Sequence, residues 1–405
     1  MTTKRISHIV LVIVQLGFLL TLTGCWDSVE LNRRAIVSGV AIDRGPTDDK
    51  KYIISFQVIV AEEISGKNAR GTSPVALFTG SGRTMFEALA NTSRQTARFL
   101  SLGHIRVLVI SEKFAREGIK DITDVLERNG EMRLTSLVFI SRGQPASYSM
   151  STMTVFSKIP ANDLVEKLET TSKQFGYNYK MEIDDVIRGI QVRGGGPLIN
   201  GVYVSGPREK GDSIDNLKTI APQDLLKISG ISAFKDDKLK GWLDGDAAIG
   251  ASLLQNKIKE LPILIKLKEG SYVAFNVYQS QVHVKAEAAD PEHPVFTVKI
   301  SQQATLKESF NPLDLTNPEV LNQLSVLLSK ETRLKIESAI SSARKLKSDF
   351  LGFGEAMERE NPRGWKKVRD HWEDIFTSCK INVESDAVIR HTDMRTDSLQ
   401  INKSE

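Results

Sequence analysis

The four residues Leu22-Thr23-Gly24-Cys25 are the part of the sequence whose types and spacing most clearly support chemistry. A leucine, a small residue, a glycine and a cysteine form the pattern of a lipobox. The small residues let the chain lie extended in a protease groove, and the thiol accepts a diacylglyceryl group as a thioether. We therefore expect cleavage just before Cys25 and a membrane lipid on its sulfur.

The segment before Cys25 has the organisation of a secretory signal peptide. Lys4 and Arg5 give a short positive start, and an apolar run over 9–20 follows them. A membrane-spanning helix is the competing interpretation, but it needs about 20 apolar residues. An ordinary signal peptide with a chance cysteine is the other alternative. Because two acyl chains anchor a protein stably where one does not, we predict a signal peptide over 1–24 and a lasting anchor.

Local signatures of nucleotide binding and catalysis are missing from the rest of the sequence. The stretch Gly80-Ser-Gly-Arg-Thr84 resembles a phosphate loop, but the motif requires glycine at Leu77 and lysine at Arg83. The patterns G-x-S-x-G, H-E-x-x-H and C-x-x-C do not occur. We expect no catalytic residue and no cofactor, although a hydrolase built from residues far apart in the sequence stays open.

The histidines after the predicted cleavage site do not have the spacing of metal ligands on a helix face. His283 and His293 are the pair that a hairpin would bring together. Surface histidines are usually only solvated, so we predict no metal site. The five histidines are His104, His283, His293, His371 and His391.

Composition excludes one class of partner and limits how the fold is held together. The chain has 54 basic and 50 acidic side chains, with no basic block among aromatic residues, so nucleic acid is not expected as a partner. The second of its two cysteines, Cys379, has no intramolecular partner if Cys25 is lipidated. An exported chain without a disulfide depends on its hydrophobic core. This length predicts two or three domains.

Hydrophobic periodicity predicts alternating strands and helices in the first half of the chain. Residues 35–43 and 52–60 read as an antiparallel pair of strands. The order of elements after them indicates a mixed sheet with helices against it. The further strands are predicted over 75–79, 105–110, 134–140 and 199–204, and the helices over 83–99, 114–128 and 154–190.

The second half is predicted to restart with a hairpin and to end on a long helix and a strand. Asn317 and Pro318 mark the start of the long helix, as N-cap and first helical residue. Three runs of alternating hydrophobicity before it look like a meander. The hairpin covers 226–242, a helix 246–257, the meander 272–279, 281–288 and 295–305, and the last strand 381–389.

The predicted fold class is α+β, multi-domain, with mixed and mostly antiparallel sheets flanked by helices. A polar stretch over 205–222 is interpreted as the linker between the two main parts. The predicted division is a signal peptide over 1–24, an N-terminal α/β region over 25–204, whose split into about 26–150 and 151–204 is left open, the linker, a C-terminal sheet-plus-long-helix domain over 223–391, and a polar tail over 392–405.

Five stretches of the sequence together match the pattern of one known family. The stretch Cys25-Trp-Asp-Ser-Val-Glu-Leu-Asn32 is followed by the strand Ile36-Val-Ser-Gly-Val-Ala-Ile-Asp43. The strand departs mildly from the family pattern, because Ala41 stands where a second glycine is common. The further matches are Gly103-His-Ile-Arg-Val-Leu-Val-Ile110, Lys240-Gly-Trp-Leu-Asp244 and Asp349-Phe-Leu-Gly-Phe-Gly354. In these stretches the chain resembles the Ger(x)C proteins, which are the C subunits of spore germinant receptors.

The resemblance implies a three-domain fold and a role without a known catalytic activity. Family members sit on the outer face of the inner spore membrane with two membrane-embedded subunits, A and B. The complex responds to small germinants such as amino acids or sugars, and the germinant is a candidate ligand of the complex. Besides the lipid site, the family-motif positions carry no assigned role; they are Trp26, Asp27, Glu30, Leu31, Asn32, Gly39, Asp43, Trp242, Gly352, Phe353 and Gly354.

A second hypothesis, from another class, is a lipid-anchored protein that captures a small solute for a transporter. Such proteins usually have two similar α/β lobes. This sequence shows no duplicated half, which favours the receptor subunit. Tight binding of one amino acid or sugar by the purified chain alone would favour the solute-binding protein.

Overall fold

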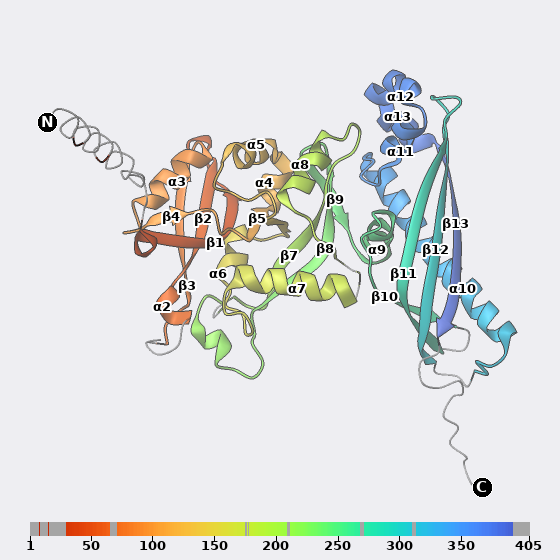
Figure 1. Ribbon diagram of the computed structural model, residues 1–405, viewed down its shortest axis with the longest axis horizontal. Coiled ribbons are helices and arrows are strands. Elements are labelled where there is room, and N and C mark those ends of the chain that lie inside the picture. The colour runs from red at the N-terminus through yellow and green to blue at the C-terminus, as the bar shows by residue number, and fades with distance from the viewer. Residues whose placement is uncertain are drawn as a thin grey trace, which may run out of the picture.

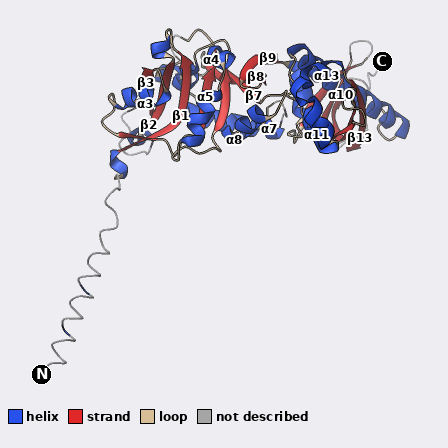
Figure 2. Cartoon of the chain, turned by 90° about the horizontal axis from the view of Figure 1, so that it is seen from above, coloured by secondary structure: helices blue, strands red, loops and turns tan. Residues whose placement is uncertain are grey.

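A computed structural model shows two β-sheets with helices packed on them (Figure 1). It describes residues 30–64, 71–174, 176, 178–208, 211–267, 271–309 and 313–391, together with His8 and Gln15. Figure 2 shows the two sheets side by side along the long axis of the molecule. The predicted α+β class with mixed sheets is confirmed. The predicted tail over 392–405 lies outside the described residues.

The first sheet is parallel in its centre and antiparallel at both flanks. Its strand order is β3-β2-β1-β5-β6-β7-β8-β9, and β4 pairs with β1. The pairs β1–β5, β5–β6 and β6–β7 are parallel. The strands are β1 (Arg34–Arg44), β2 (Tyr52–Ile59), β3 (Val75–Gly82), β4 (Phe99–Ser101), β5 (Val107–Ser111), β6 (Leu137–Ser141), β7 (Leu198–Ser205), β8 (Leu225–Lys235) and β9 (Lys238–Leu243).

Helices cover both faces of this sheet, which explains why its central strands are apolar throughout. Successive side chains of a strand point to opposite faces. Val107 and Val109 therefore pack with α6 and α7, whereas Leu108 and Ile110 pack with α3, α4, α5 and α8. The helices are α2 (Ala61–Ile64), α3 (Met85–Ser93), α4 (Glu112–Glu117), α5 (Lys120–Arg128), α6 (Ala146–Ser151), α7 (Pro160–Gln174) and α8 (Ile183–Gln191).

The hairpin after the polar stretch 205–222 belongs to the first sheet. That hairpin, β8 and β9, does not open the second sheet, because β8 pairs antiparallel with β7 of the first. The register aligns Val202 with Ile228 and Val204 with Leu226. The polar stretch is thus an excursion between neighbouring strands of one sheet.

The second sheet has the order β10-β11-β12-β13 and carries one long helix. In that helix the Asn317 side chain accepts a hydrogen bond from the Glu319 amide at 2.9 Å, and Pro318 is the first helical residue. The predicted N-cap is therefore confirmed. The elements are α9 (Gly245–Leu254), β10 (Leu261–Lys266), β11 (Tyr272–Glu287), β12 (Val295–Ser309), α10 (Pro318–Leu346), α11 (Phe353–Glu360), α12 (Pro362–Val368), α13 (Trp372–Ser378) and β13 (Lys380–His391).

The predicted meander is wrong in one respect. The runs 272–279 and 281–288 belong to one continuous strand, β11, which is irregular between Val277 and Gln279 rather than turned. The junction Gln279-Ser280-Gln281 contains no glycine, proline, asparagine or aspartate, so it lacks the residues that most strongly favour a tight turn. The strand β10, which the periodicity did not single out, supplies the remaining antiparallel partner.

Candidate functional site

The residues singled out at the start of the chain are only partly within the described structure. Leu22, Thr23, Gly24, Cys25, Trp26 and Asp27 lie outside the described residues. Glu30 and Asn32 are exposed, and Leu31 begins a short 3₁₀ turn that leads directly into β1. In the described part of the chain, no helix is long and apolar enough to cross a membrane.

Two family-motif residues of β1 fix helix α6 against the first sheet. A Cβ atom at Gly39 would lie 2.6 Å from the sulfur of Met150 and 3.0 Å from Ala161 Cβ, so a larger residue there would force these side chains to shift. The Asp43 carboxylate accepts hydrogen bonds from the Ala146 amide at 2.7 Å and the Ser147 amide at 3.1 Å. Both oxygens are therefore engaged in holding the start of α6.

Trp242 lies under an arginine that ties β9 to the loop after β6. The Arg142 guanidinium makes two hydrogen bonds to Asp244, at 2.7 and 2.8 Å, and stands 4.7 Å from the Trp242 ring centre. The hydrogen bonds from Arg142 lower the pKa of Asp244 below its ordinary value. A bidentate pair stacked on an indole fixes geometry more firmly than a simple surface ion pair.

The folded chain brings Asp43 to the same end of the sheet as this cluster, at the carboxyl ends of the parallel strands. A hollow of about 730 Å³ there is lined by Asp43, Glu112 and Gly143, among others. Glu112 accepts from the Gly143 amide at 2.9 Å and from Arg116 at 2.6 Å. Although burial acts against ionisation, these hydrogen bonds lower the pKa of Glu112.

Ligands of open α/β sheets usually bind at such an end. In this hollow, however, the carboxylates of Asp43 and Glu112 already accept from backbone amides or arginine. A general base needs an oxygen that faces the proton to be removed. These hydrogen bonds hold the neighbouring loops and the starts of helices in place.

The segment 349–354 forms a second, separate cluster around one buried carboxylate. Asp349 Oδ1 accepts from the Gly352 and Phe353 amides, both at 3.1 Å. Its Oδ2 accepts from the Gly354 amide at 2.6 Å and from Trp372 Nε1 at 2.9 Å. Asp349 therefore satisfies the free amides at the start of α11, and the left-handed φ of +87° at Gly352 directs them toward it.

Phe353 and Gly354 have packing roles around this cap. Phe353 is fully buried, with its ring 5.2 Å from that of Phe296. A Cβ atom at Gly354 would lie 2.9 Å from the Trp365 ring and 3.0 Å from Trp372 Nε1. The small residue allows the helix start to pack against both indoles.

The same segment connects the second sheet to the first. The Asp349 amide donates to Gly194 O at 2.9 Å, and Ser348 Oγ donates to Phe234 O at 2.7 Å. Gly194 precedes β7 and Phe234 belongs to β8. The sequence pointed to the glycines and Phe353 but assigned no role to Asp349, although an aspartate shortly before a Gly-Phe-Gly turn is the pattern of a side-chain cap.

The histidines do not assemble in the way a hairpin pairing would require. His283 lies opposite Lys299 in the β11–β12 register, not opposite His293, so the suggested pairing is wrong. His293 instead contacts Asp290 at 2.9 Å, and His371 contacts Glu292 at 3.1 Å. Among the described residues, no three His, Cys, Asp or Glu side chains gather as metal ligands.

Comparison with known proteins decides the family. A model of the spore germination protein N-terminal domain matches residues 27–202, and a model of the spore germination B3/GerAC-like C-terminal domain matches residues 229–393. The chain belongs to the Ger(x)C family of spore germination proteins. The recognition from the motifs around Cys25, Asp43, Trp242 and Gly352 is thereby confirmed.

Relatives of the Ger(x)C family match this chain over nearly its whole length. Spore germination protein KC of Bacillus subtilis (strain 168) is 30% identical over 398 residues, covering 96% of this chain and 97% of that protein. Spore germination protein B3 of the same organism is 24% identical, covering 90% and 92%. The crystal structure of the GerBC protein has the same fold, with a TM-score of 0.52 at 19% identity over 87% of this chain and 96% of that one.

Proposed function

We propose that this chain is a non-enzymatic lipoprotein subunit of a nutrient germinant receptor, required for assembly of the receptor and for triggering germination. Its partners are the membrane-embedded A and B subunits, and the complex binds a small-molecule germinant. The observation that carries the proposal is the family match from residue 27 to residue 393.

The location follows from the start of the chain. A diacylglyceryl group on Cys25 holds the chain on the outer face of the inner spore membrane. Only a short stretch separates Cys25 from β1, which begins at Arg34. The lipobox Leu22-Thr23-Gly24-Cys25 supports this proposal. The first sheet then lies near the membrane surface, where membrane-embedded partners are within reach.

The structural roles of the motif residues support the proposal of a non-enzymatic subunit. Asp43 caps α6, Asp349 caps α11, and Gly39 and Gly354 allow close packing. A subunit that acts as a scaffold needs helices held rigidly against its sheets in this way.

Spores that lack this chain test the proposal. We expect them to lose the response to at least one amino acid or sugar, measured as the fall in optical density after the nutrient is added. Restoring the wild-type chain should restore that response. An unchanged response to every nutrient, together with tight binding of one amino acid or sugar by the purified chain, would instead support the solute-binding protein.

A further inference from the structure

Basic side chains from five separate parts of the chain surround one pocket, which we call the basic pocket. Its volume is about 710 Å³. It lies between the amino ends of β5 and β6, the second half of α7 and the segment after α9. Its basic residues among the described part of the chain are Arg106, Arg133, Lys173, Lys180, Lys257 and Lys259.

The charge of the basic pocket is strongly unbalanced. Of its described lining residues, only Glu169 carries a carboxylate, whereas the whole chain has a net charge of only +4. Lys180 is paired with Glu182 at 2.5 Å. Arg133, Lys173, Lys257 and Lys259 have no ion-pair partner among the described residues. Cations gathered in a concave site attract anions more strongly than cations spread over a surface.

Tyr179, a buried residue whose hydroxyl has no partner among the described groups, is one of the residues that line the basic pocket. The Tyr179 side chain is 3% exposed, and its hydroxyl makes no hydrogen bond with any described group. The backbone there is held firmly, since Asn200 Nδ2 donates to Tyr179 O at 2.7 Å and Asn178 Nδ2 donates to Asn200 Oδ1 at 3.1 Å. A buried hydroxyl without a hydrogen-bond partner lowers the stability of the fold. A ligand oxygen that accepts a hydrogen bond from it would therefore gain binding energy.

The pocket also has an apolar side. Ile105, Leu137 and Leu168 are buried and line it together with Val165. Pockets of several hundred Å³ with apolar walls and a few convergent polar groups are typical small-molecule sites. The apolar wall offers room for a carbon body, and the cations offer contacts for more than one negative group.

We propose that the basic pocket binds a small organic anion that carries two or more carboxylate or phosphate charges. Lysine and arginine side chains hold its oxygens, and the Tyr179 hydroxyl donates a hydrogen bond to one of them. A free metabolite and the headgroup of an anionic lipid share this chemistry. The inference does not depend on the receptor function.

Calorimetric titration of the full chain in neutral detergent tests the proposal, at constant ionic strength because salt screens such contacts. The probes are citrate and inorganic pyrophosphate, with acetate as the singly charged control. We expect one-to-one binding of citrate or pyrophosphate, and binding by acetate at least ten-fold weaker.

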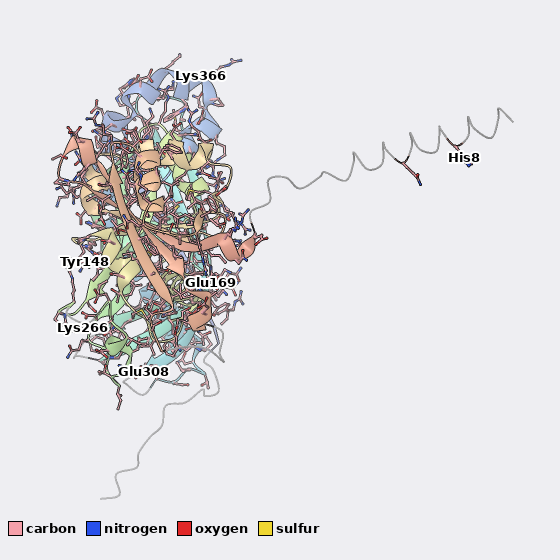
Figure 3. All side chains as sticks on the ribbon, turned by 90° about the vertical axis from the view of Figure 1, so that its left-hand side faces the viewer. His8, Tyr148, Glu169, Lys266, Glu308 and Lys366 are labelled. Carbon is pink, nitrogen blue, oxygen red and sulfur yellow. The ribbon has the colours of Figure 1, made fainter. Side chains whose placement is uncertain are left out.

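A double variant, Lys173→Ala with Lys259→Ala, should weaken that binding at least ten-fold. The matched control is Lys366→Ala with Lys367→Ala, two exposed lysines of α12 that remove the same charge. Figure 3 shows Lys366 at the top of the molecule, well away from Glu169 at the pocket. The control should bind as the wild type does.

Tyr179→Phe separates binding from folding. Removing an unpaired hydroxyl should leave the unfolding temperature unchanged or raise it, while weakening anion binding about three-fold to ten-fold. A merely structural tyrosine would leave binding unchanged. The proposal is overturned if neither citrate nor pyrophosphate binds, or if the lysine and tyrosine variants bind them as the wild type does.

Vesicles distinguish the two sources of the anion. The chain with Cys25→Ala, which has no lipid of its own, is floated with vesicles of phosphatidylglycerol or of phosphatidylcholine. Flotation with phosphatidylglycerol alone, competed by citrate, supports a lipid headgroup in the pocket, and no flotation supports a free anion. Flotation that citrate and the Lys173/Lys259 variant leave unchanged would overturn the pocket as the lipid site.

Discussion

Replacing Asp349 by alanine is expected to destabilise the chain by about 4 kcal/mol. The substitution leaves four buried donors without their acceptor, namely the amides of Gly352, Phe353 and Gly354 and the indole of Trp372. Each unpaired buried donor costs about 1–3 kcal/mol, and water that enters the site recovers part of this. Urea unfolding followed by tryptophan fluorescence measures the loss, because Trp372 is fully buried beside the carboxylate.

The pH dependence of stability gives a sharper test of the same carboxylate. Burial raises the pKa of Asp349 from its ordinary 3.8 to about 6, although the hydrogen bonds from Gly354, Trp372 and the neighbouring amides act in the opposite direction. Between these values the folded chain binds more protons than the unfolded chain, so the free energy of unfolding falls as pH rises. Two pKa units correspond to about 3 kcal/mol.

The variant Asp349→Asn cannot titrate and isolates this contribution. The stability of the wild type relative to this variant should fall by about 3 kcal/mol as pH rises from about 4 to about 7. Asp374→Asn, which alters an exposed carboxylate of α13, is the matched control and should show no such trend. If the stability of the wild type relative to the variant stays constant or rises over this pH window, the raised pKa of the buried Asp349 carboxyl is contradicted.

Replacing Cys25 by alanine is expected to release the chain from the membrane, with at least a ~100-fold drop in the membrane-bound fraction. Each methylene group of an acyl chain in the bilayer contributes about 0.8 kcal/mol, and two chains make an anchor stable. Fractionation of cells or spores, followed by blotting for the chain, measures the change. Labelling with a radioactive fatty acid should mark the wild type and not the variant.

Cys379→Ala is the matched control, since it removes the chain's other cysteine. Cys379 is buried with its thiol donating to Phe376 O, so its loss should not affect membrane attachment or labelling. If the Cys25→Ala chain stays in the membrane, the segment before it acts as an uncleaved membrane-spanning helix, and the lipoprotein interpretation fails.

The sequence predicted most strands of the first sheet because their apolar runs are bounded by clear turns, but it missed β4, whose first residue Phe99 fell in a predicted helix. β1 and β2 begin and end within about two residues of the predicted ranges, and Asp43 lies where β1 approaches its end. The hairpin of β8 and β9 was also predicted, but its membership of the first sheet was not. Periodicity reports which residues are buried, not which strand will pair with them, so Val202 opposite Ile228 could not be foreseen.

Several roles of the site residues depend on contacts between residues that lie far apart in the sequence. Asp43 and Ala146 are far apart in the chain, so the cap of α6 was not visible as a local motif. The cap of α11 is local, because Asp349 accepts from the amides of residues 352–354, but its hydrogen bond from Trp372 was not visible. The basic pocket was equally hidden, since the sequence contains no basic block. Its cations, from Arg106 to Lys259, meet only because β5, β6 and α7 place them around one hollow.

Co-purification from dormant-spore membranes tests the central claim, that this chain is a receptor subunit, most directly. Wild-type and Cys25→Ala chains are isolated from detergent-solubilised membranes and blotted for the chain and for the A and B subunits. The account predicts that the wild type brings both subunits with it, and that the variant is lost from the membrane together with the response to nutrient. A wild-type chain that is membrane-bound but alone, and whose removal leaves germination unchanged, would contradict it.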